Sequence, residues 1–214
     1  MTVTLTDAMI RAWAAFERED WTQAEALYCE ILNDPILTSL EQQGARFGLG
    51  YVLAYVQRFD EARELFVSLR EQAAAGDDLA FEHVALHQVG MVERMAGHWE
   101  AAQDCFERER ELIARLGNAP LAVAVNAYEL GTVAQHLGRY GEAKAWLDLS
   151  LTCAERTDDL IAVGCAHRGL GDWHSAQGQI EEALSCWRPA HASFLAAGDD
   201  RAASDVERRI QSNS

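Results

Sequence analysis

The sequence has little of several residue types, and each shortage excludes a class of structure. Only 3 of its 214 residues are proline, and no stretch resembles a low-complexity linker, so we expect one continuous structured body. Runs of Val, Ile and Thr are nearly absent, whereas Ala, Leu, Glu, Arg and Gln recur throughout. That composition favours helices over strands. No apolar run is long enough to cross a bilayer, so no membrane partner is expected.

Positive charge is also scarce. Lys and Arg number 18 against 34 Asp and Glu, which gives a formal net charge of −16. Such a field repels phosphate backbones, so we expect no nucleic-acid partner, and it suits a basic protein partner. Lys144 is the only lysine, and this preference for arginine indicates a GC-rich bacterial genome.

The cysteines and the N-terminal residues indicate a cellular compartment. The number of cysteines is odd and none stands in a CxxC motif: Cys29, Cys105, Cys153, Cys165 and Cys186. Each has apolar neighbours in a helix-like segment, which predicts reduced, buried thiols. The first residues, MTVTLTDAMIRAW, have no basic region followed by an apolar stretch and do not resemble a secretory signal. We therefore expect a cytoplasmic protein.

One pattern recurs along the whole chain, about every forty residues. Its centre is an alanine, found at Ala24, Ala62, Ala102, Ala143 and Ala183. Three positions before it stands a large side chain: Trp21, Phe59, Trp99, Tyr140 and Ile180. Four positions after it stands another: Tyr28, Phe66, Phe106, Leu147 and Trp187. We expect all of these residues to pack in the core.

A small residue precedes each central alanine by twelve positions: Ala12, Gly50, Gly90, Gly131 and Gly171. Because glycine inside a helix costs about 1 kcal/mol relative to alanine, its recurrence indicates two helices that approach closely. Turn signals stand between the copies, at 76–78, 117–119, 157–159 and 198–200, and within them, at 97–98, 138–139 and 178–179. Each copy is therefore predicted to form a helix, a tight turn, a second helix and a short junction.

The stretch LGYVLAYVQRFDEARELF at 49–66, with its copies, resembles the tetratricopeptide repeat (TPR) signature. Its period exceeds the standard 34 residues and is similar to the extended repeats of Pins/LGN-type scaffolds, Rap-type peptide receptors and bacterial transcription regulators. HEAT repeats share this length, but the spacing of small residues fits TPR better. The usual proline at the end of the second helix is missing from most copies, and Pro35 is its nearest equivalent. The resemblance covers roughly residues 5 to 197.

The resemblance implies an all-α fold, a right-handed α-solenoid of about five helical hairpins. The expected repeats are 5–37, 38–77, 78–118, 119–158 and 159–198, within a single domain over 1–214. A C-terminal capping helix is expected at about 199–211, where Ala203, Val206 and Ile210 share one face.

In the resembled family the first helix of each hairpin lines a concave groove, and positions carried from that family define a candidate ligand surface. They are Met9, Trp13, Phe16 and Glu17 in the first copy, Phe47, Tyr51 and Tyr55 in the second, His87, Met91, Arg94 and Met95 in the third, Tyr128, Thr132, Gln135 and His136 in the fourth, and Arg168 and Asp172 in the fifth. The alternative is that half of them pack against neighbouring hairpins.

This set mixes aromatic rings, methionines and a few polar groups, which suits recognition of a peptide or a helix. Arg94 and Arg168 are expected to anchor a carboxylate. The TPR clamp for chaperone C-termini uses asparagine at positions occupied here by other residues, so that clamp is not expected. These residues are Gly48, Gln88, Glu129 and Gly169.

The sequence motifs give little support for an enzymatic function. His83 and His87 are four residues apart, but the segment reads HVALH rather than HExxH. His167 and His174 are assigned to packing positions, and the two GLG triplets, 48–50 and 169–171, lie inside predicted helices. We expect no metal, no cofactor and no catalytic residue.

The sequence therefore predicts a non-catalytic scaffold or adaptor that binds a protein or peptide. Two alternatives from other classes are a regulatory domain that senses a peptide or small ligand and, more remotely, a metal-dependent enzyme. No feature decides between a monomer and a homo-oligomer.

Overall fold

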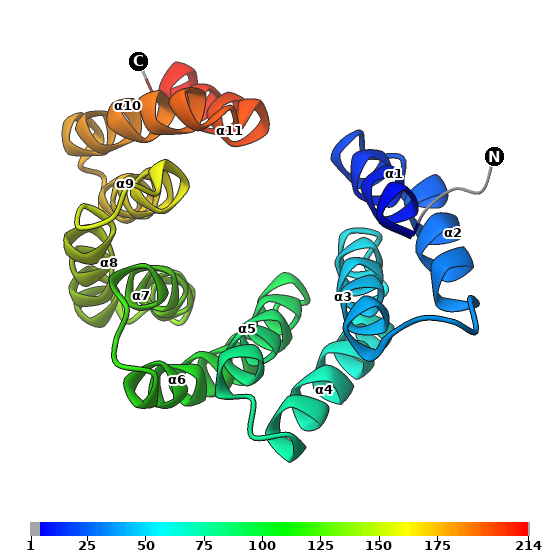
Figure 1. Ribbon diagram of the computed structural model, residues 1–214. Coiled ribbons are helices and arrows are strands. Elements are labelled where there is room, and N and C mark those ends of the chain that lie inside the picture. Colours follow the sequence, from blue (N-terminus) through cyan, green and yellow to red (C-terminus); the bar gives the residue numbers. More distant parts are fainter. Residues whose placement is uncertain (1–4, 214) are drawn as a thin grey trace. The chain divides into compact units, whose positions relative to one another are not determined.

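The computed structural model of the protein describes residues 5–213, so residues 1–4 and 214 of the predicted domain lie outside the described part. This part contains eleven α-helices and no strand (Figure 1). They are α1 (Leu5–Glu17), α2 (Trp21–Leu32), α3 (Ser39–Tyr55), α4 (Phe59–Ala75), α5 (Leu79–Met95), α6 (Trp99–Arg115), α7 (Pro120–His136), α8 (Tyr140–Ala154), α9 (Leu160–Ala176), α10 (Ile180–Ala197) and α11 (Asp200–Ser212). The predicted all-α class is confirmed.

The helices form two compact units, residues 1–102 and 103–214, and the boundary in the sequence falls within α6. In the first unit α1 packs on α2, α2 on α3, α3 on α4, and α4 on α5. In the second unit α7 packs on α8, α8 on α9, α9 on α10, and α10 on α11, while α7 also contacts α9. Packing between sequence neighbours is typical of a helical repeat. The boundaries of the single repeats stay a prediction.

Aspartates between successive hairpins start the next helix. The carboxylates of Asp78, Asp159 and Asp199 each accept a hydrogen bond from the backbone N–H three residues later, at 3.0, 2.8 and 2.9 Å. Each side chain thereby satisfies one of the N–H groups that a helix leaves unpaired at its first turn. The helix starts predicted after the turn signals at 76–78, 157–159 and 198–200 are confirmed.

The turn inside each hairpin requires a left-handed residue. Gly97, Gly138 and Gly178 have φ values of 80°, 74° and 73° at this position. In the first two hairpins the same region is occupied by Glu19 at φ 59° and Gln57 at φ 64°. A side chain in this conformation is unfavourable by roughly 1–2 kcal/mol, so these two turns carry a local cost that the glycine turns avoid.

The recurring glycines make room for large side chains from the paired helix. A Cβ atom on Gly50 would lie 2.5 Å from Cζ of Phe66, and one on Gly171 would lie 2.3 Å from Cδ1 of Trp187. At Gly131 the nearest atom, Cγ of Leu147, would be at 2.7 Å. All three distances are shorter than van der Waals contact. The prediction that these glycines permit close helix packing is confirmed.

The predicted core is confirmed at the central alanines and at the large residues that follow them. The five alanines are fully buried, and so are the large residues four positions later. The large residues that precede the alanines behave differently. Trp21, Phe59, Trp99 and Ile180 are only half-buried, and Tyr140 is 40% exposed. The core assignment is wrong for Tyr140: it begins its helix just as the four half-buried residues do, but its neighbours leave more of its ring uncovered.

The five cysteines are free thiols, but their burial differs from the prediction. Only Cys153 is buried; Cys105, Cys165 and Cys186 are half-buried, and Cys29 is exposed. Cys29 lies on α2 one residue after Tyr28, so it faces away from the core that Tyr28 fills.

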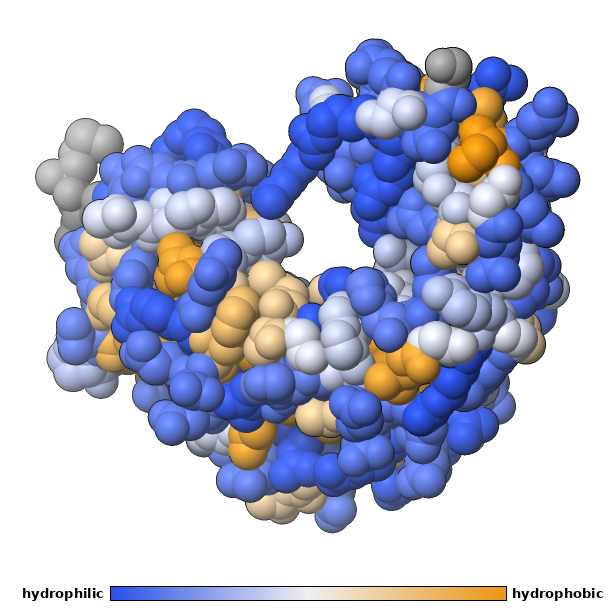
Figure 2. Space-filling view, turned by 180° about the vertical axis from the view of Figure 1, so that it is seen from behind, coloured by the Kyte–Doolittle hydropathy of each residue, from blue (hydrophilic) through white to orange (hydrophobic). Residues whose placement is uncertain are grey.

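The surface reflects the acidic composition. Figure 2 shows one face of the molecule, on which hydrophilic residues predominate and hydrophobic residues form small patches. None of the described helices has both the length and the apolar character needed to cross a bilayer.

Candidate functional site

The first unit contains an open groove of about 480 Å³ between α1 and α3. Five predicted ligand residues line it: Met9, Trp13 and Glu17 from α1, and Phe47 and Tyr51 from α3. The structure thus brings the first and second predicted sets to one site. We call this site the aromatic groove.

Two glycines on α3 give the aromatic groove its depth. A Cβ atom on Gly48 would lie 2.3 Å from Cζ of Tyr28, and one on Gly44 would lie 3.5 Å from Cε of Met9. The ring of Tyr28, which is 2% exposed, therefore reaches beneath α3 from α2 and forms the floor. A larger residue at position 48 would collide with this ring.

The aromatic rings of the groove contact one another. The ring centroids of Trp13 and Phe16 are 5.0 Å apart, and those of Phe47 and Tyr51 are 5.2 Å apart. Trp13 and Tyr51 meet across the groove, with centroids at 6.4 Å. The cluster continues to Tyr55, whose centroid is 5.3 Å from that of Phe16. Such pairs contribute about 0.5–1.5 kcal/mol each beyond burial, so the groove walls are preorganised.

Polar groups in the aromatic groove are few. The indole N–H of Trp13 donates to Oε1 of Glu17 at 2.9 Å. Burial, and to a lesser degree the neighbouring Tyr55, raises the pKa of Tyr51 to about 12, so its hydroxyl stays neutral at physiological pH. Ile10 and Trp13 remain 61% and 44% exposed. The site therefore offers an apolar wall to solvent and a neutral phenol within it.

The third predicted set lies on α5. His87, Met91, Arg94 and Met95 are all half-buried there. Nη2 of Arg94 approaches Sδ of Met91 at 3.6 Å. None of the four residues lines the aromatic groove, so the structure does not unite them with the first two sets.

In the second unit Arg168 of α9 lies between two aromatic rings. Its guanidinium carbon is 5.7 Å from the ring centroid of Tyr128 on α7 and 5.4 Å from that of Phe194 on α10. Nη2 donates to the Tyr128 hydroxyl at 2.8 Å. No carboxylate of the described residues forms an ion pair with Arg168. The guanidinium is therefore positioned by aromatic contacts and keeps hydrogen-bond donors for another acceptor.

Asp172, one turn after Arg168, is engaged by the protein itself. Its Oδ1 accepts hydrogen bonds from the indole N–H of Trp187 at 2.8 Å and from Nε of Arg209 at 2.9 Å. Burial raises the pKa of Asp172, and Arg209 on α11 acts in the opposite direction. Asp172 thus connects α9 to the terminal helix, a contact that the sequence reasoning did not anticipate.

The remaining predicted residues of the second unit lie on α7. Thr132 donates back to the carbonyl of Tyr128 at 2.9 Å, and Gln135 donates to the backbone carbonyl of Asp172 at 3.4 Å. His136 is exposed at the end of the helix. Gln135 therefore lies near the Arg168 site, whereas Thr132 is occupied within its own helix.

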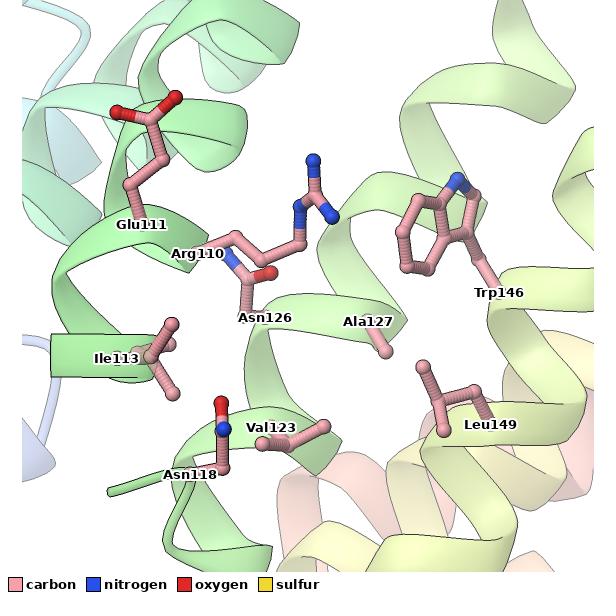
Figure 3. A pocket seen from close by; sticks show the side chains of 10 residues that line it. Arg110, Glu111, Ile113, Asn118, Val123, Asn126, Ala127, Trp146 and Leu149 are labelled. Atoms are coloured by element: carbon pink, nitrogen blue, oxygen red, sulfur yellow. The ribbon is translucent and has the colours of Figure 1, made fainter. Parts of the chain in front are cut away.

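The second unit also has a cavity that the repeat positions did not reveal. It lies among α6, α7 and α8, has a volume of about 330 Å³, and is lined in part by Arg110, Asn126 and Trp146 (Figure 3). The only signal in the sequence is Asn126, a polar residue within the otherwise apolar run PLAVAVNA.

Neither histidine pair belongs to a larger group of potential metal ligands in the described part of the chain. No group of three or more His, Cys, Asp or Glu side chains there has the arrangement that a metal ion needs. Burial lowers the pKa of His167, which favours a neutral ring at physiological pH.

Comparison with known proteins supports the repeat assignment. A tetratricopeptide repeat family profile matches residues 123–188, from α7 into α10. No curated protein sequence matches the chain.

Several solved structures share the fold. BtubC from P. vanneervenii is 18% identical and has a TM-score of 0.70, covering 90% of this chain and 80% of its own. A thermophilic TPR protein from Thermus thermophilus is 16% identical, with a TM-score of 0.69 and 98% of each chain covered. A Rap protein complexed with Competence and Sporulation Factor is 15% identical, with a TM-score of 0.67 over 97% of this chain and 63% of its own. The tetratricopeptide repeat profile therefore matches part of the second unit, and the solved structures show that nearly the whole chain shares their α-solenoid fold.

Proposed function

We propose that the chain is a non-catalytic scaffold or adaptor that binds a segment of a partner protein in the aromatic groove. The observation that carries the proposal is the exposed apolar wall formed by Ile10 and Trp13, which faces Phe47 and Tyr51 across the groove. Exposed apolar surface in a preformed concavity is typical of an interaction site, because covering it removes water from ordered rings.

The partner segment is expected to combine an apolar anchor with basic neighbours. The apolar anchor follows from the lining, in which Glu17 is the only charged side chain. The basic neighbours follow from the net charge of −16 and from Asp7, which is exposed on α1. An amphipathic helix with one basic face, or a short extended peptide of that composition, satisfies both requirements.

The related structures support this kind of function at the level of the fold. The Rap protein, of which this chain covers 63%, was solved in complex with Competence and Sporulation Factor. In this chain the aromatic groove is the larger of the two cavities described above, at about 480 Å³.

The proposal can be tested with a matched pair of charge substitutions. Ile10 lines the groove, whereas Ile36 lies in the α2–α3 connection, outside the groove lining, and is 85% exposed. Partner proteins are first retained from a lysate on the wild-type chain and identified, and one purified partner is then titrated against Ile10→Glu and Ile36→Glu. Because both residues are exposed, neither substitution should unfold the chain.

We expect Ile10→Glu to weaken partner binding by about tenfold or more, since a buried isoleucine contributes about 1.5–3 kcal/mol. Ile36→Glu should bind like the wild type. Equal affinities for the two variants would refute the assignment of the aromatic groove. Circular dichroism of both variants verifies that the helices are intact.

Arg168 favours a second candidate function, a regulatory domain that senses an acidic peptide or small ligand. Its guanidinium forms no ion pair with the described residues and is held between the rings of Tyr128 and Phe194. A ligand of this site should raise the unfolding midpoint of the wild type but not of Arg168→Gln. If acidic peptides stabilise neither protein, the sensor function is contradicted while the scaffold function is unaffected.

A further inference from the structure

The cavity among α6, α7 and α8 has the composition of a small-ligand site. Its volume of about 330 Å³ lies at the lower end of the roughly 300–1,000 Å³ typical of ligand pockets. Most of its wall is apolar, formed by Ile113, Val123, Ala127, Trp146 and Leu149. We call it the α6–α8 pocket. It belongs wholly to the second unit and shares no residue with the aromatic groove.

Arg110 brings a positive charge to this apolar wall. Its guanidinium carbon is 5.6 Å from the ring centroid of Trp146, and it forms no ion pair with the described residues. Figure 3 shows Arg110 reaching from α6 toward Trp146 on α8, while the carboxylate of Glu111 points away from the indole. The pocket therefore presents a guanidinium suited to an anionic group.

Asn126 adds a buried hydrogen-bond acceptor. Its side-chain nitrogen donates to the carbonyl of Phe106 at 2.8 Å and to Oε2 of Glu109 at 2.9 Å. Because both partners are acceptors, the orientation of the amide is fixed and both of its hydrogens are used. The oxygen accepts no hydrogen bond from the described residues, and Figure 3 shows it on the Trp146 side of Asn126. A ligand in the pocket can donate to this oxygen.

We propose that the α6–α8 pocket binds a small apolar carboxylic acid that carries an N–H next to its carboxylate. Arg110 binds the carboxylate, the amide oxygen of Asn126 accepts the N–H, and the apolar body lies against Trp146 and Leu149. This is the chemistry of an apolar amino acid, either free or at the carboxyl end of a peptide. The site goes beyond the scaffold function proposed above.

The experiment uses three probes and one matched pair of variants. The probes are N-acetyl-L-phenylalanine, its neutral amide and free L-phenylalanine. Binding is followed by the NMR signal of the Trp146 indole N–H, which is assigned with Trp146→Phe. Arg110→Gln removes the proposed anchor, and Arg108→Gln removes the same charge from an exposed position of α6 that does not line the pocket. Titrations at about 0.15 M salt keep long-range repulsion by the acidic surface small.

The wild type and Arg108→Gln should bind N-acetyl-L-phenylalanine with saturation, and Arg110→Gln should bind it at least tenfold more weakly. The wild type should bind the neutral amide more weakly than N-acetyl-L-phenylalanine, by a similar factor. Leu149→Glu, which places a carboxylate on the exposed rim, should also weaken binding of the acid. Asn126 is left unchanged, because its replacement would also remove the hydrogen bonds that it donates to Glu109 and to the Phe106 carbonyl.

Three results would overturn the proposal: no saturation with either acid up to about 10 mM, equal binding of the acid and its amide, or equal affinity of Arg110→Gln and Arg108→Gln. If the proposal holds, tighter binding of the acetylated probe identifies a peptide terminus as the source of the ligand. Tighter binding of free L-phenylalanine identifies an amino acid. Because Ile10 lies in the other unit, failure of this proposal leaves the test of the aromatic groove unaffected.

Discussion

Gly171→Ala tests whether the recurring glycines are required by packing. Position 171 lies in the interior of α9, where a methyl group would lie 2.3 Å from Cδ1 and 2.5 Å from Nε1 of Trp187. That indole is 2% exposed and its N–H donates to Asp172. The added methyl must therefore displace a large buried ring that also makes a hydrogen bond.

The expected cost follows from three contributions. Overpacking of a core costs about 1–3 kcal/mol. Disturbing the hydrogen bond from Trp187 to the Asp172 carboxylate costs about 1.5–3 kcal/mol. Alanine regains about 1 kcal/mol over glycine in a helix. We therefore expect Gly171→Ala to lower the free energy of unfolding by roughly 3 kcal/mol.

The assay is equilibrium urea unfolding followed by far-UV circular dichroism, with Gly141→Ala as the control. Gly141 is exposed on α8, and a Cβ atom there would meet nothing within 4 Å. This control should leave stability unchanged or raise it by up to about 1 kcal/mol. A Gly171→Ala protein as stable as the control would refute the argument that the glycine is needed for helix contact.

Two further predictions concern the first unit. Gln57→Gly should raise the free energy of unfolding by about 1 kcal/mol because it relieves a left-handed side chain, whereas Gly97→Ala should lower it in the same urea assay. A fall for Gln57→Gly or a rise for Gly97→Ala would contradict the turn assignment. Burial raises the pKa of Glu93, but hydrogen bonds from Arg63 and His98 outweigh it and leave the pKa lowered. Because the folded pKa lies below the unfolded value of about 4.3, the stabilisation is complete above that pH and lost as the pH falls through the folded value. The stabilities of the wild type and Glu93→Gln should therefore differ at pH 7, and the difference should shrink as the pH falls below about 4.3; a constant difference would be inconsistent with this pKa shift.

The sequence predicted the helical hairpins well because their contacts are local and repeated. Gly50 and Phe66 belong to the same hairpin, and their counterparts recur at equal spacing, so the pair is visible as a pattern. Tyr140 shows where this reasoning ends. It occupies the same register as Trp21 and likewise starts its helix, yet Trp21 is half-buried and Tyr140 is exposed, because burial depends on the side chains that neighbouring helices bring to each position.

The candidate sites could be predicted only in part. Family positions identified Trp13 and Tyr51, but the depth of their groove depends on Gly48 and the ring beneath it. The pair of Asn126 and Glu109 joins different helices and follows no repeat, because it depends on the rotation of each helix about its axis. A period in the sequence cannot encode such a unique contact.

The tie between Asp172 and Arg209 gives the end of the second unit a different physical character from its interior. Arg209 also binds Asp205 within α11, at 2.5 Å, and all three side chains are about one-third exposed. Dissolved ions screen such pairs, whereas the glycine–aromatic contacts between α9 and α10 are insensitive to them. Rising ionic strength should therefore open the backbone amides of α11 to hydrogen exchange before those of α9, which makes the attachment of the last helix sensitive to salt.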